Sequence, residues 1–426
     1  MNIACFSHYF TPEIGAPSAR IHELGKEWLK QGHQVQVVTC FPNHPGGRVY
    51  PGYARSLYLR ETIDEIQVHR HWTYIAANNG LIKKTIGHIS FLPSALLLSN
   101  RHLESIDVAI GTSPTFFAAI AAAILARRRN IPFVMEVRDL WPAILMGLGV
   151  VKNSTVIRAL ERIELALYRQ AAGVVTVSEA FRRDLLKRGT PAHKVATIPN
   201  GADLEYWKPM NSPQDLREKL RLNGRFIVLY IGAHGISHGL EHVLESAGRL
   251  RQVEKIHFLF VGSGAQKESL IKRAKEMRLE NVTFLDPAGK DEVRRYYALS
   301  DVCLVPLRNI PLFEGFVPSK MFEILAMGRP IVGSVRGEAA EILERSGGAS
   351  VVPPEGSAAM AEAILRIAGS PEQARIMGTK GRSFVERNYS RYSLARRYSE
   401  VLQEAIAEHR RGYKGEGRVV KGTEGL

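Results

Sequence analysis

Short apolar runs alternate with segments of helical apolar spacing along this sequence, and the alternation occurs twice. The first series of expected strands covers residues 3–7, 34–39, 107–111, 132–137, 173–177 and 195–198. The second series covers residues 226–232, 256–262, 282–285, 302–306 and 331–334. Strands that alternate with helices build parallel sheets through right-handed crossovers. The pattern therefore predicts an α/β protein with two doubly wound halves.

A segment rich in residues that break helices and strands separates the two halves. Proline, asparagine and serine supply four of the five residues from 209 to 213, which is typical of an interdomain linker. We therefore expect an N-terminal domain at residues 1–205 and a C-terminal domain at residues 214–389. Doubly wound sheets bind ligands beyond the carboxyl ends of their strands, so we expect a substrate site in a cleft that the two domains share.

The composition is that of an ordinary globular protein, with 45% hydrophobic and 23% charged residues in a chain of 426. This excludes collagen-like, coiled-coil and disordered classes. The three cysteines lie far apart and suggest neither a disulfide framework nor a thiolate zinc site. The N-terminus lacks the pattern of a secretory signal, and the longest apolar run, 116–126, is shorter than the roughly 20 residues of a spanning helix. We therefore expect a cytoplasmic protein.

The chain carries a large excess of positive charge. Its net charge is +15, from 57 Lys and Arg residues against 42 Asp and Glu residues, and such an excess favours an anionic partner. Nucleic acid, anionic lipid and a phosphorylated substrate are all candidates. Part of the excess lies at residues 410–426, which we expect to form a basic, disordered tail.

The segment with the clearest functional pattern is FEGFVPSKMFEILAMGRP, residues 313–330. A glycine-containing loop there enters a helix through Pro318 and Ser319, residue types that favour a helix start. Backbone N–H groups and the positive end of the helix dipole would face an anion at this point. Glu323, one turn later, would accept hydrogen bonds from ribose hydroxyls. A capped surface helix without a ligand fits the same residues.

This segment resembles the donor-site motif of glycosyltransferase family 4, and the resemblance extends over nearly the whole chain. Members of that family are retaining enzymes of the GT-B fold, in which two Rossmann-like domains face each other across a cleft and a nucleotide sugar is the donor. The resemblance implies that residues 1–205 form the acceptor domain and residues 214–389 the donor domain. It also implies that a helix at residues 390–409 crosses back to the first domain.

The family motif contains two glutamates separated by seven residues, and the second one binds the ribose. Glu323 matches the second glutamate, whereas Gly315 stands eight positions before it and Glu314 one position further. Either the loop is longer by one residue or the contact of the first glutamate is lost. We take Glu314 as a catalytic candidate on this basis.

Two glycine turns that follow strands of the second half resemble the diphosphate-binding turns of the family. The first turn usually carries an arginine and a lysine. This chain has His234 and His238 nearby instead, which would bind the diphosphate if protonated or as neutral donors. Each turn alone is also consistent with an ordinary tight connection between a strand and a helix. The expected donor-binding residues are Gly15, Gly232, His234, His238, Gly262, Pro287, Ser319, Lys320 and Glu323.

Three charged residues end an apolar strand in VMEVRDLWP, residues 134–142. They would face the cleft from the carboxyl end of this strand, although a structural salt bridge is the alternative interpretation. RDLWP, together with CFPNHPGGRVYPGY at residues 40–53, resembles the family members that build colanic acid, capsule and O-antigen, of the L-fucosamine transferase type. The expected catalytic residues are Asp139, Arg138 and Glu314, and the expected acceptor-binding residues are Asn43, His44 and Glu136.

The resemblance implies transfer of a sugar, with an N-acetylated aminosugar on UDP as the first expectation, to a lipid-linked saccharide in bacterial surface polysaccharide biosynthesis. No metal or other cofactor is expected, because the sequence has no Asp-x-Asp pair and no His/Asp cluster at ligand spacing. Residues 80–102 mix apolar side chains with Lys83, Lys84 and Arg101, which favours a peripheral position on an anionic surface at the inner face of the membrane. Two short core helices interrupted at Pro93 fit the same segment.

Other functions remain open at this point. A transferase with a soluble acceptor, or a UDP-sugar epimerase, would use the same fold. A nucleic-acid-binding protein would account for the charge, but the sequence has no helix-turn-helix signature, zinc finger or aromatic ladder. A nucleic acid partner is therefore not expected.

Overall fold

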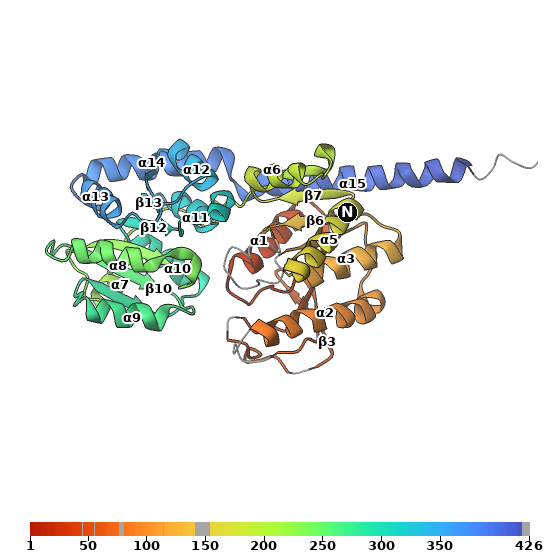
Figure 1. Cartoon of the computed structure of the whole chain (residues 1–426), viewed down its shortest axis with the longest axis horizontal. Coiled ribbons are helices and arrows are strands. Elements are labelled where there is room, and N and C mark those ends of the chain that lie inside the picture. The colour runs from red at the N-terminus through yellow and green to blue at the C-terminus, as the bar shows by residue number, and fades with distance from the viewer. Residues whose placement is uncertain (45, 55, 76–80, 114, 141–153, 420–426) are drawn as a thin grey trace, which may run out of the picture. The chain divides into compact units, whose positions relative to one another are not determined.

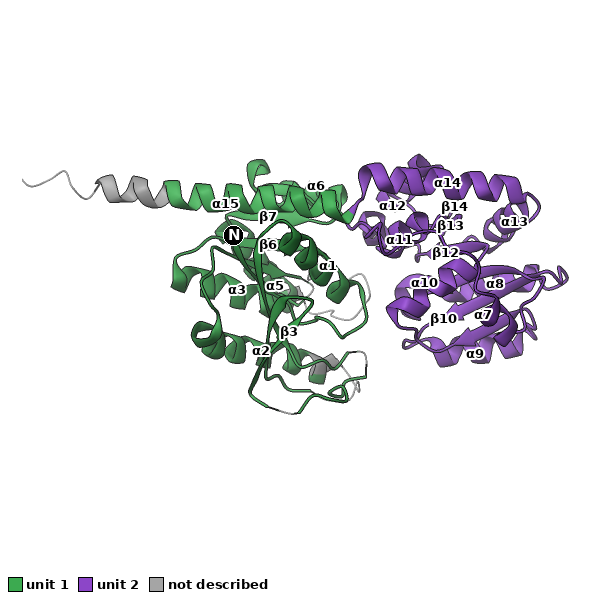
Figure 2. Ribbon diagram, turned by 180° about the vertical axis from the view of Figure 1, so that it is seen from behind, with its two compact units in different colours: residues 1–199, 391–426 green, residues 200–390 purple. Residues whose placement is uncertain are grey.

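The computed structural model describes residues 1–419 apart from 45, 55, 76–80, 114 and 141–153. The chain forms two compact units (Figure 2). Unit 1 consists of Met1–Pro199 together with the segment from Arg391 onward, and unit 2 consists of Asn200–Ser390. The division falls at residue 200, a few residues before the breaker-rich segment.

Unit 1 is built on an eight-stranded sheet with the strand order β3-β4-β2-β1-β5-β6-β7-β8, and Figure 1 shows helices of the same unit around this sheet. The strands are β1 (Asn2–Phe6), β2 (Gln34–Cys40), β3 (Tyr58–Ile63), β4 (Ile66–His71), β5 (Val108–Thr112), β6 (Phe133–Val137), β7 (Gly173–Thr176) and β8 (Val195–Thr197). The helices are α1 (Ala16–Lys30), α2 (Leu81–His102), α3 (Phe116–Arg129), α5 (Ser154–Gln170), α6 (Glu179–Lys187) and α15 (Arg391–Val419), with a short turn η1 (Ala192–Lys194). Strands β5, β6 and β7 are buried along their whole length, as expected of parallel strands covered on both faces.

The sequence did not predict the hairpin at the edge of this sheet. Strands β3 and β4 pair antiparallel, while the other strands of unit 1 pair in parallel. Their two-residue turn is Asp64–Glu65, and both residues have positive φ, 46° and 65°. Positive φ at both positions is what a tight hairpin turn requires. The usual signal for such a turn is a glycine, which this chain lacks there.

Unit 2 is built on a six-stranded parallel sheet with the order β11-β10-β9-β12-β13-β14. The strands are β9 (Phe226–Ile231), β10 (Ile256–Val261), β11 (Val282–Leu285), β12 (Val302–Pro306), β13 (Ile331–Ser334) and β14 (Ala349–Val352). The helices are α7 (Gln214–Lys219), α8 (Leu240–Arg249), α9 (Lys267–Glu276), α10 (Lys290–Leu299), α11 (Lys320–Ala326), α12 (Glu338–Ser346), α13 (Ser357–Ala368) and α14 (Pro371–Asn388), with short turns η2 (Ile236–His238) and η3 (Pro311–Gly315). Two α/β units, one with a mainly parallel and one with a parallel sheet, confirm the predicted fold class.

The central strand β9 shows how the sheet of unit 2 is buried on both faces. Ile227, Leu229 and Ile231 belong to one apolar cluster, and the intervening Val228 and Tyr230 belong to another. Successive side chains of a strand point to opposite faces, so the two clusters lie on the two faces of the sheet. The chain continues from β9 to β10 on one side, and β12 later pairs with β9 on the other. This change of direction creates the place where doubly wound sheets bind ligands.

Helix α15 packs on unit 1. Trp28 of α1 donates a hydrogen bond from its indole nitrogen to the backbone oxygen of Ala395 at 3.2 Å, and its ring meets that of Tyr398 edge to face at 5.3 Å. Arg391 and Glu23 form a buried ion pair of 2.9 Å. The helix continues to Val419, so the prediction of a disordered tail from residue 410 is wrong for its first part. Residues 420–426 lie outside the described residues.

Helix α2 runs from Leu81 to His102 without a break at Pro93. The predicted interruption is therefore wrong. A proline removes one backbone donor and crowds the preceding turn, but Pro93 is exposed, where water can satisfy the carbonyl that loses its partner. No helix among the described residues is long and apolar enough to span a membrane.

Candidate functional site

Lys320 places a cation at the carboxyl end of the unit 2 sheet. It is the first residue of α11, and its Nζ donates a hydrogen bond to the backbone oxygen of Ile231, at the end of β9, at 3.0 Å. The ammonium lies 4.4 Å from the centre of the Tyr230 ring, within cation–π range. Burial lowers the pKa of Lys320 to about 8, and Glu323 opposes this shift. Lys320 is therefore mostly protonated at neutral pH, but less firmly than an exposed lysine.

Gly232 leaves the space that the Lys320 ammonium occupies. A Cβ at Gly232 would lie 2.7 Å from Lys320 Nζ, and the backbone φ is +142°. A residue with a side chain would be strained at this φ, and it would also displace the ammonium. The turn after β9 therefore needs glycine because a lysine approaches it.

The glycines of the next turn admit another part of the protein backbone. A Cβ at Gly262 would lie 1.9 Å from the backbone oxygen of Gly232. A Cβ at Gly264 would lie 2.5 Å from the backbone oxygen of His234. The two turns after β9 and β10 thus pack backbone against backbone, which explains both glycines without a ligand.

A buried tyrosine orients Glu323, the expected ribose-binding residue. The hydroxyl of Tyr297, in α10, donates a hydrogen bond to Glu323 Oε2 at 3.2 Å. Tyr297 is 1% exposed, whereas Glu323 is partly exposed. The tyrosine therefore holds a carboxylate that solvent can still reach. Sequence reasoning missed Tyr297, because its contact with Glu323 spans 26 residues.

His234 is fully buried beside the lysine. It is 0% exposed, and neither of its ring nitrogens has a hydrogen-bond partner among the described residues. The rings of Tyr230 and Phe284 lie 5.8 and 6.2 Å from its own ring. Burial lowers the pKa of His234 to about 4, and the charges of Lys267 and Lys320 add to this shift. The imidazole is therefore neutral at neutral pH.

His238 ends the short turn η2 and has one backbone partner. Its Nδ1 lies 3.4 Å from the backbone oxygen of Pro306, at the end of β12. Burial lowers the pKa of His238 to about 3, with Lys320 adding to the effect. The sequence left open whether the two histidines are protonated or neutral. The structure favours neutral imidazoles in the free protein.

Of the other expected residues of unit 2, Glu314 and Pro287 are exposed and Ser319 is half-buried. Glu314 is exposed in η3, and its backbone oxygen would contact a Cβ at Gly337 at 2.2 Å. Pro287 is exposed in the turn after β11. Ser319 makes no capping hydrogen bond to α11, although its residue type favours that role. The assignments of Glu314, Pro287 and Ser319 to the site stay predictions.

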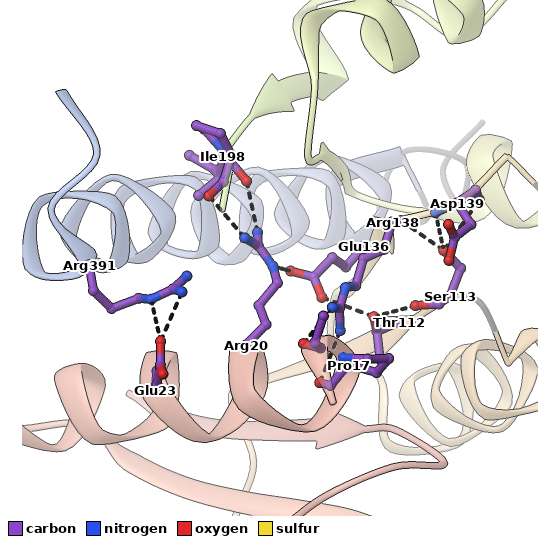
Figure 3. A network of polar contacts seen from close by, with 12 residues as sticks. Pro17, Arg20, Glu23, Thr112, Ser113, Glu136, Arg138, Asp139, Ile198 and Arg391 are labelled. Carbon is purple, nitrogen blue, oxygen red and sulfur yellow. Dashed lines mark hydrogen bonds and ion pairs between the residues drawn. The ribbon is translucent and has the colours of Figure 1, made fainter. Parts of the chain in front are cut away.

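In unit 1, Glu136, an expected acceptor-binding residue, forms a buried ion pair with Arg20 (Figure 3). Its Oε1 accepts a hydrogen bond from Arg20 Nε at 3.0 Å, and its Oε2 accepts one from the Thr112 hydroxyl at 2.9 Å. Arg20 also donates to the backbone oxygens of Ile198 and Pro199 at 2.8 and 2.9 Å. Burial raises the pKa of Glu136, but the charges of Arg20 and Arg138 and the hydrogen bonds from Arg20 and Thr112 together outweigh burial, so the pKa is lowered. The structure therefore favours the salt-bridge interpretation of Glu136.

Arg138 holds the loop that contains Gly15. Its guanidinium donates to the backbone oxygens of Pro17 at 3.0 Å and Ala16 at 2.7 Å (Figure 3). Burial lowers its pKa to about 10, and Glu136 opposes the shift. Arg138 thus binds the backbone at the start of α1 through its charged guanidinium. Gly15, the residue before this helix, is exposed and has a φ of +150°.

Asp139 follows Arg138 and is partly exposed. Its backbone N–H donates to the hydroxyl of Ser113 at 3.2 Å, and that hydroxyl also lies 3.4 Å from its backbone oxygen (Figure 3). Burial raises the pKa of Asp139 to about 6, with Arg138 opposing the shift. The carboxylate is thus mostly ionised at neutral pH and can still accept a proton. Residues 141 and 142 of the RDLWP motif lie outside the described residues.

A glutamate that the sequence did not mark organises the loop of Asn43 and His44. Glu13 Oε1 accepts the backbone N–H groups of both residues at 2.8 Å, and its Oε2 accepts that of Phe10 at 3.2 Å. The Asn43 amide donates to the backbone oxygen of Phe41 at 2.9 Å. Glu13 therefore fixes the backbone of residues 43 and 44, and both of these expected acceptor residues are partly exposed. The one available signal was a carboxylate inside a loop of prolines and glycines.

Two family models match the chain, one in each unit. The model described as "Glycosyl transferase 4-like domain" matches residues 15–201. The model described as "Glycosyl transferases group 1" matches residues 225–370.

Curated proteins match along most of the chain. The chain is 27% identical over 410 residues to the putative colanic acid biosynthesis glycosyl transferase WcaI of Escherichia coli (strain K12), covering 93% of this chain and 98% of that protein. It is 25% identical over 336 residues to the probable glycosyltransferase WbjE of Pseudomonas aeruginosa, covering 78% and 82%.

Solved structures share the fold at low sequence identity. Sucrose-phosphate synthase from Thermosynechococcus elongatus has a TM-score of 0.75 at 20% identity, covering 96% of this chain and 99% of that chain. HepE of Anabaena, in complex with UDP-glucose, has a TM-score of 0.71 at 16% identity, covering 95% and 99%.

Proposed function

The chain belongs to glycosyltransferase family 4 and has the GT-B fold, and from this premise we propose that it moves a sugar from UDP to a lipid-linked saccharide. The sugar is an N-acetylated aminosugar, the anomeric configuration is retained, and the product is a bacterial surface polysaccharide. The relative named for colanic acid biosynthesis supports the polysaccharide. The structural neighbour in complex with UDP-glucose supports the UDP-sugar donor.

The observation that carries this proposal is the pairing of a cation and an oriented carboxylate on one short helix of unit 2. Lys320 places its ammonium at the end of β9, and Glu323 lies one turn further along α11, oriented by Tyr297. A nucleotide sugar presents a diphosphate and a ribose, which need a cation and a hydrogen-bond acceptor. We therefore assign the diphosphate to Lys320 and the ribose to Glu323.

Charge development in the reaction explains why a partly buried lysine suits this position. When the bond between the anomeric carbon and the phosphate breaks, negative charge grows on the leaving diphosphate. A preorganised donor aimed at such charge is typically worth about 3 to 4 kcal/mol of the barrier. Because the ammonium of Lys320 is desolvated, its interaction with the diphosphate is stronger than in water. We propose that this lysine and backbone N–H groups meet the charge without a metal.

In unit 1 we propose that Asp139 orients the acceptor hydroxyl. The carboxylate follows the buried network of Glu136 and Arg138, and with a pKa of about 6 it is mostly ionised at neutral pH. An ionised carboxylate accepts a hydrogen bond from a hydroxyl. Arg138 then serves as a positioning residue, because its guanidinium is occupied by backbone oxygens.

The proposed lipid-linked acceptor needs contact with a bilayer, and α2 offers exposed apolar side chains for it. Ile86, Ile89 and Leu97 are 45%, 46% and 71% exposed on this helix, which carries the basic Arg101 in its last turn. Vesicles of anionic phospholipid should pull down the protein, and Ile86→Ser with Ile89→Ser should weaken this binding. Leu365→Ser, at an exposed position of unit 2, is the control. Equal binding of all three proteins would contradict the peripheral membrane position.

Thermal stabilisation by nucleotides tests the donor. A ligand that binds the native state raises the melting temperature, so UDP and UDP-sugars should do so while GDP and ADP compounds should not. Glu323→Ala should abolish the shift. Glu362→Ala, at an exposed position of α13, should preserve it. A panel without any shift would contradict the transferase itself, and a shift with another base would contradict only UDP.

A further inference from the structure

Four basic side chains lie within electrostatic reach of one another at the carboxyl end of the unit 2 sheet. Lys320 acts on the pKa of both His234 and His238, Lys267 acts on that of His234, and His234 acts on that of His238. Nearby charges shift the pKa of a group in this way. Two carboxylates act on the lysines of this cluster: Glu323 raises the pKa of Lys320, and the exposed Asp286 pairs with Lys267 at 2.8 Å.

His234 is the least satisfied member of this cluster. Both of its ring nitrogens are buried without a partner among the described residues. A buried polar group without a hydrogen bond is costly and calls for an explanation. Tyr230, Phe260 and Phe284 offer it only ring contacts. In the free protein the imidazole therefore lies beside lysines that disfavour its protonation, and its ring nitrogens have no hydrogen-bond partner among the described residues.

Two further basic side chains lie near Gly239, the residue after His238, and both have their own partners. Arg308 follows β12, donates its backbone N–H to the oxygen of Ser237 at 2.9 Å and pairs with Glu355 at 3.4 Å. His242 of α8 lies 3.3 Å from Glu245. The lysines, and not these groups, thus set the electrostatic environment of His234 and His238.

We propose that binding of the nucleotide sugar to unit 2 is coupled to the uptake of a proton by the pair His234 and His238. This inference rests on the proposed function. A diphosphate brings two negative charges into the cluster, and a nearby negative charge favours a protonated imidazole. The proton comes from solvent and is shared by the pair, because each histidine disfavours the charge of the other. Protonated, either ring donates from both nitrogens.

The coupling makes the affinity depend on pH in a defined direction. Uptake of a proton on binding means that the affinity rises as the pH falls, by about tenfold per pH unit for each proton taken up. Lys320 has a pKa of about 8, so any proton that Lys320 takes up on binding is taken up near or above pH 8, where the histidine pair is neutral. The histidine pair acts below about pH 7, where a lysine is already protonated.

Calorimetric titration with UDP-glucose measures the uptake directly. The diphosphate of UDP-glucose is esterified at both ends and does not itself titrate in this range. Binding is measured at about pH 6 and about pH 8, each in two buffers of different ionisation enthalpy, neither of them phosphate. We expect a fraction of a proton to one proton to be taken up near pH 6, and a Kd several-fold lower there than at pH 8.

Two variants assign the uptake to the pair. In the double variant His234→Gln with His238→Gln, uptake near pH 6 should disappear, while some affinity remains at pH 8 through Lys320. His257→Gln is the matched control, because burial also lowers the pKa of His257, which pairs with Thr283 at 2.8 Å on neighbouring strands. The control should retain the uptake.

The outcomes separate this inference from the proposed function. Binding of UDP-glucose without proton uptake near pH 6 overturns the coupling and leaves the transferase intact. Uptake that persists in the double variant also overturns it. Absence of any binding at every pH overturns the proposed UDP donor and the coupling together. The measurement on the unmodified chain decides the matter even if the double variant does not fold.

Discussion

The carboxyl ends of the two sheets differ in how the buried polar groups described there are hydrogen-bonded. In unit 1, Glu136 uses both carboxylate oxygens and Arg138 binds two backbone oxygens, so the network at the sheet end is internally satisfied. In unit 2, neither ring nitrogen of His234 has a hydrogen-bond partner among the described residues, and Lys320 donates to the backbone oxygen of Ile231. A satisfied network holds a fixed shape, whereas an unsatisfied one gains from a ligand. Unit 1 thus supplies a rigid frame and unit 2 a site with unmet charge.

The largest expected effect comes from removing the buried ion pair of Arg20 and Glu136 in unit 1. Glu136→Gln leaves Arg20 buried without its countercharge, which should lower the free energy of unfolding by about 3 to 5 kcal/mol. Because the folded pKa of Glu136 is lowered, its contribution is present at neutral pH and is lost as the pH falls. Urea denaturation measures the loss. Glu372→Gln breaks an exposed pair with Arg375 of 2.8 Å and should cost less than about 1 kcal/mol; equal losses would contradict the contrast.

The next effect tests the space around the Lys320 ammonium. Gly232→Ala places a Cβ 2.7 Å from Nζ at φ +142°, which should strain the turn by about 1 to 3 kcal/mol and reduce the nucleotide-induced rise in melting temperature. Gly235→Ala is the comparison, because Gly235 has φ −108° and no neighbour within 4 Å of a Cβ. If UDP-glucose raises the melting temperature of both variants equally, the close approach of Lys320 to Gly232 does not contribute to nucleotide binding.

A smaller effect depends on the charge of Lys320. Its pKa of about 8 in the free protein means that the ammonium loses its proton as the pH rises above that value. The affinity for UDP-glucose should then weaken by up to about tenfold per pH unit, as calorimetry between pH 7 and 10 would measure. Lys320→Met should bind more weakly and with a flatter profile. A flat profile in the unmodified protein would argue that another group meets the diphosphate.

The smallest effect sharpens the role of the buried tyrosine. Tyr297→Phe removes the hydrogen bond of 3.2 Å to Glu323 and should weaken nucleotide binding by about 0.5 to 1.5 kcal/mol. Tyr296→Phe, at the adjacent half-buried position, provides the control. Unchanged affinity in Tyr297→Phe would show that α11 orients Glu323 without help.

Apolar patterning predicted most of the fold because the parallel strands are buried on both faces. The strands β5, β6 and β7 read as continuous apolar runs for this reason. The hairpin of β3 and β4 was missed, since β3 is half exposed and its turn has Asp64 and Glu65 in place of glycine. The helix break predicted at Pro93 is absent from α2. The prediction used the low helix propensity of proline, which takes no account of the exposed position of Pro93 or of the packing of the helix.

Sequence motifs named candidate residues of unit 2 but did not show the surroundings of their side chains. Motif spacing brought out Lys320 and Glu323, which the structure places on one short helix. It could not show that His234 lies unpartnered among rings and lysines, because Lys267 and Phe284 are distant in sequence. Likewise, the hold of Glu13 on residues 43 and 44 bridges about 30 residues. Contacts of this kind depend on tertiary packing and leave no local pattern.

The return of α15 to unit 1 has a consequence for the order of folding. Unit 1 needs Arg391 and the residues after it, which are separated from Pro199 by the whole of unit 2. Closing a flexible loop of that length would cost about 5 kcal/mol of chain entropy. In unit 2, Ala202 pairs with Ser390 and donates its backbone N–H to Tyr389 at 3.0 Å, so the two connections leave side by side.

Folding of unit 2 therefore brings residues 199 and 391 together before α15 docks on α1. We expect unit 2 to fold first, and an isolated segment 200–390 should show a cooperative thermal transition of its own. A segment 200–390 that stays unfolded would mean that the two units fold only together. In either outcome, unit 1 is complete only after α15, which follows the whole of unit 2 in the sequence, has packed on it.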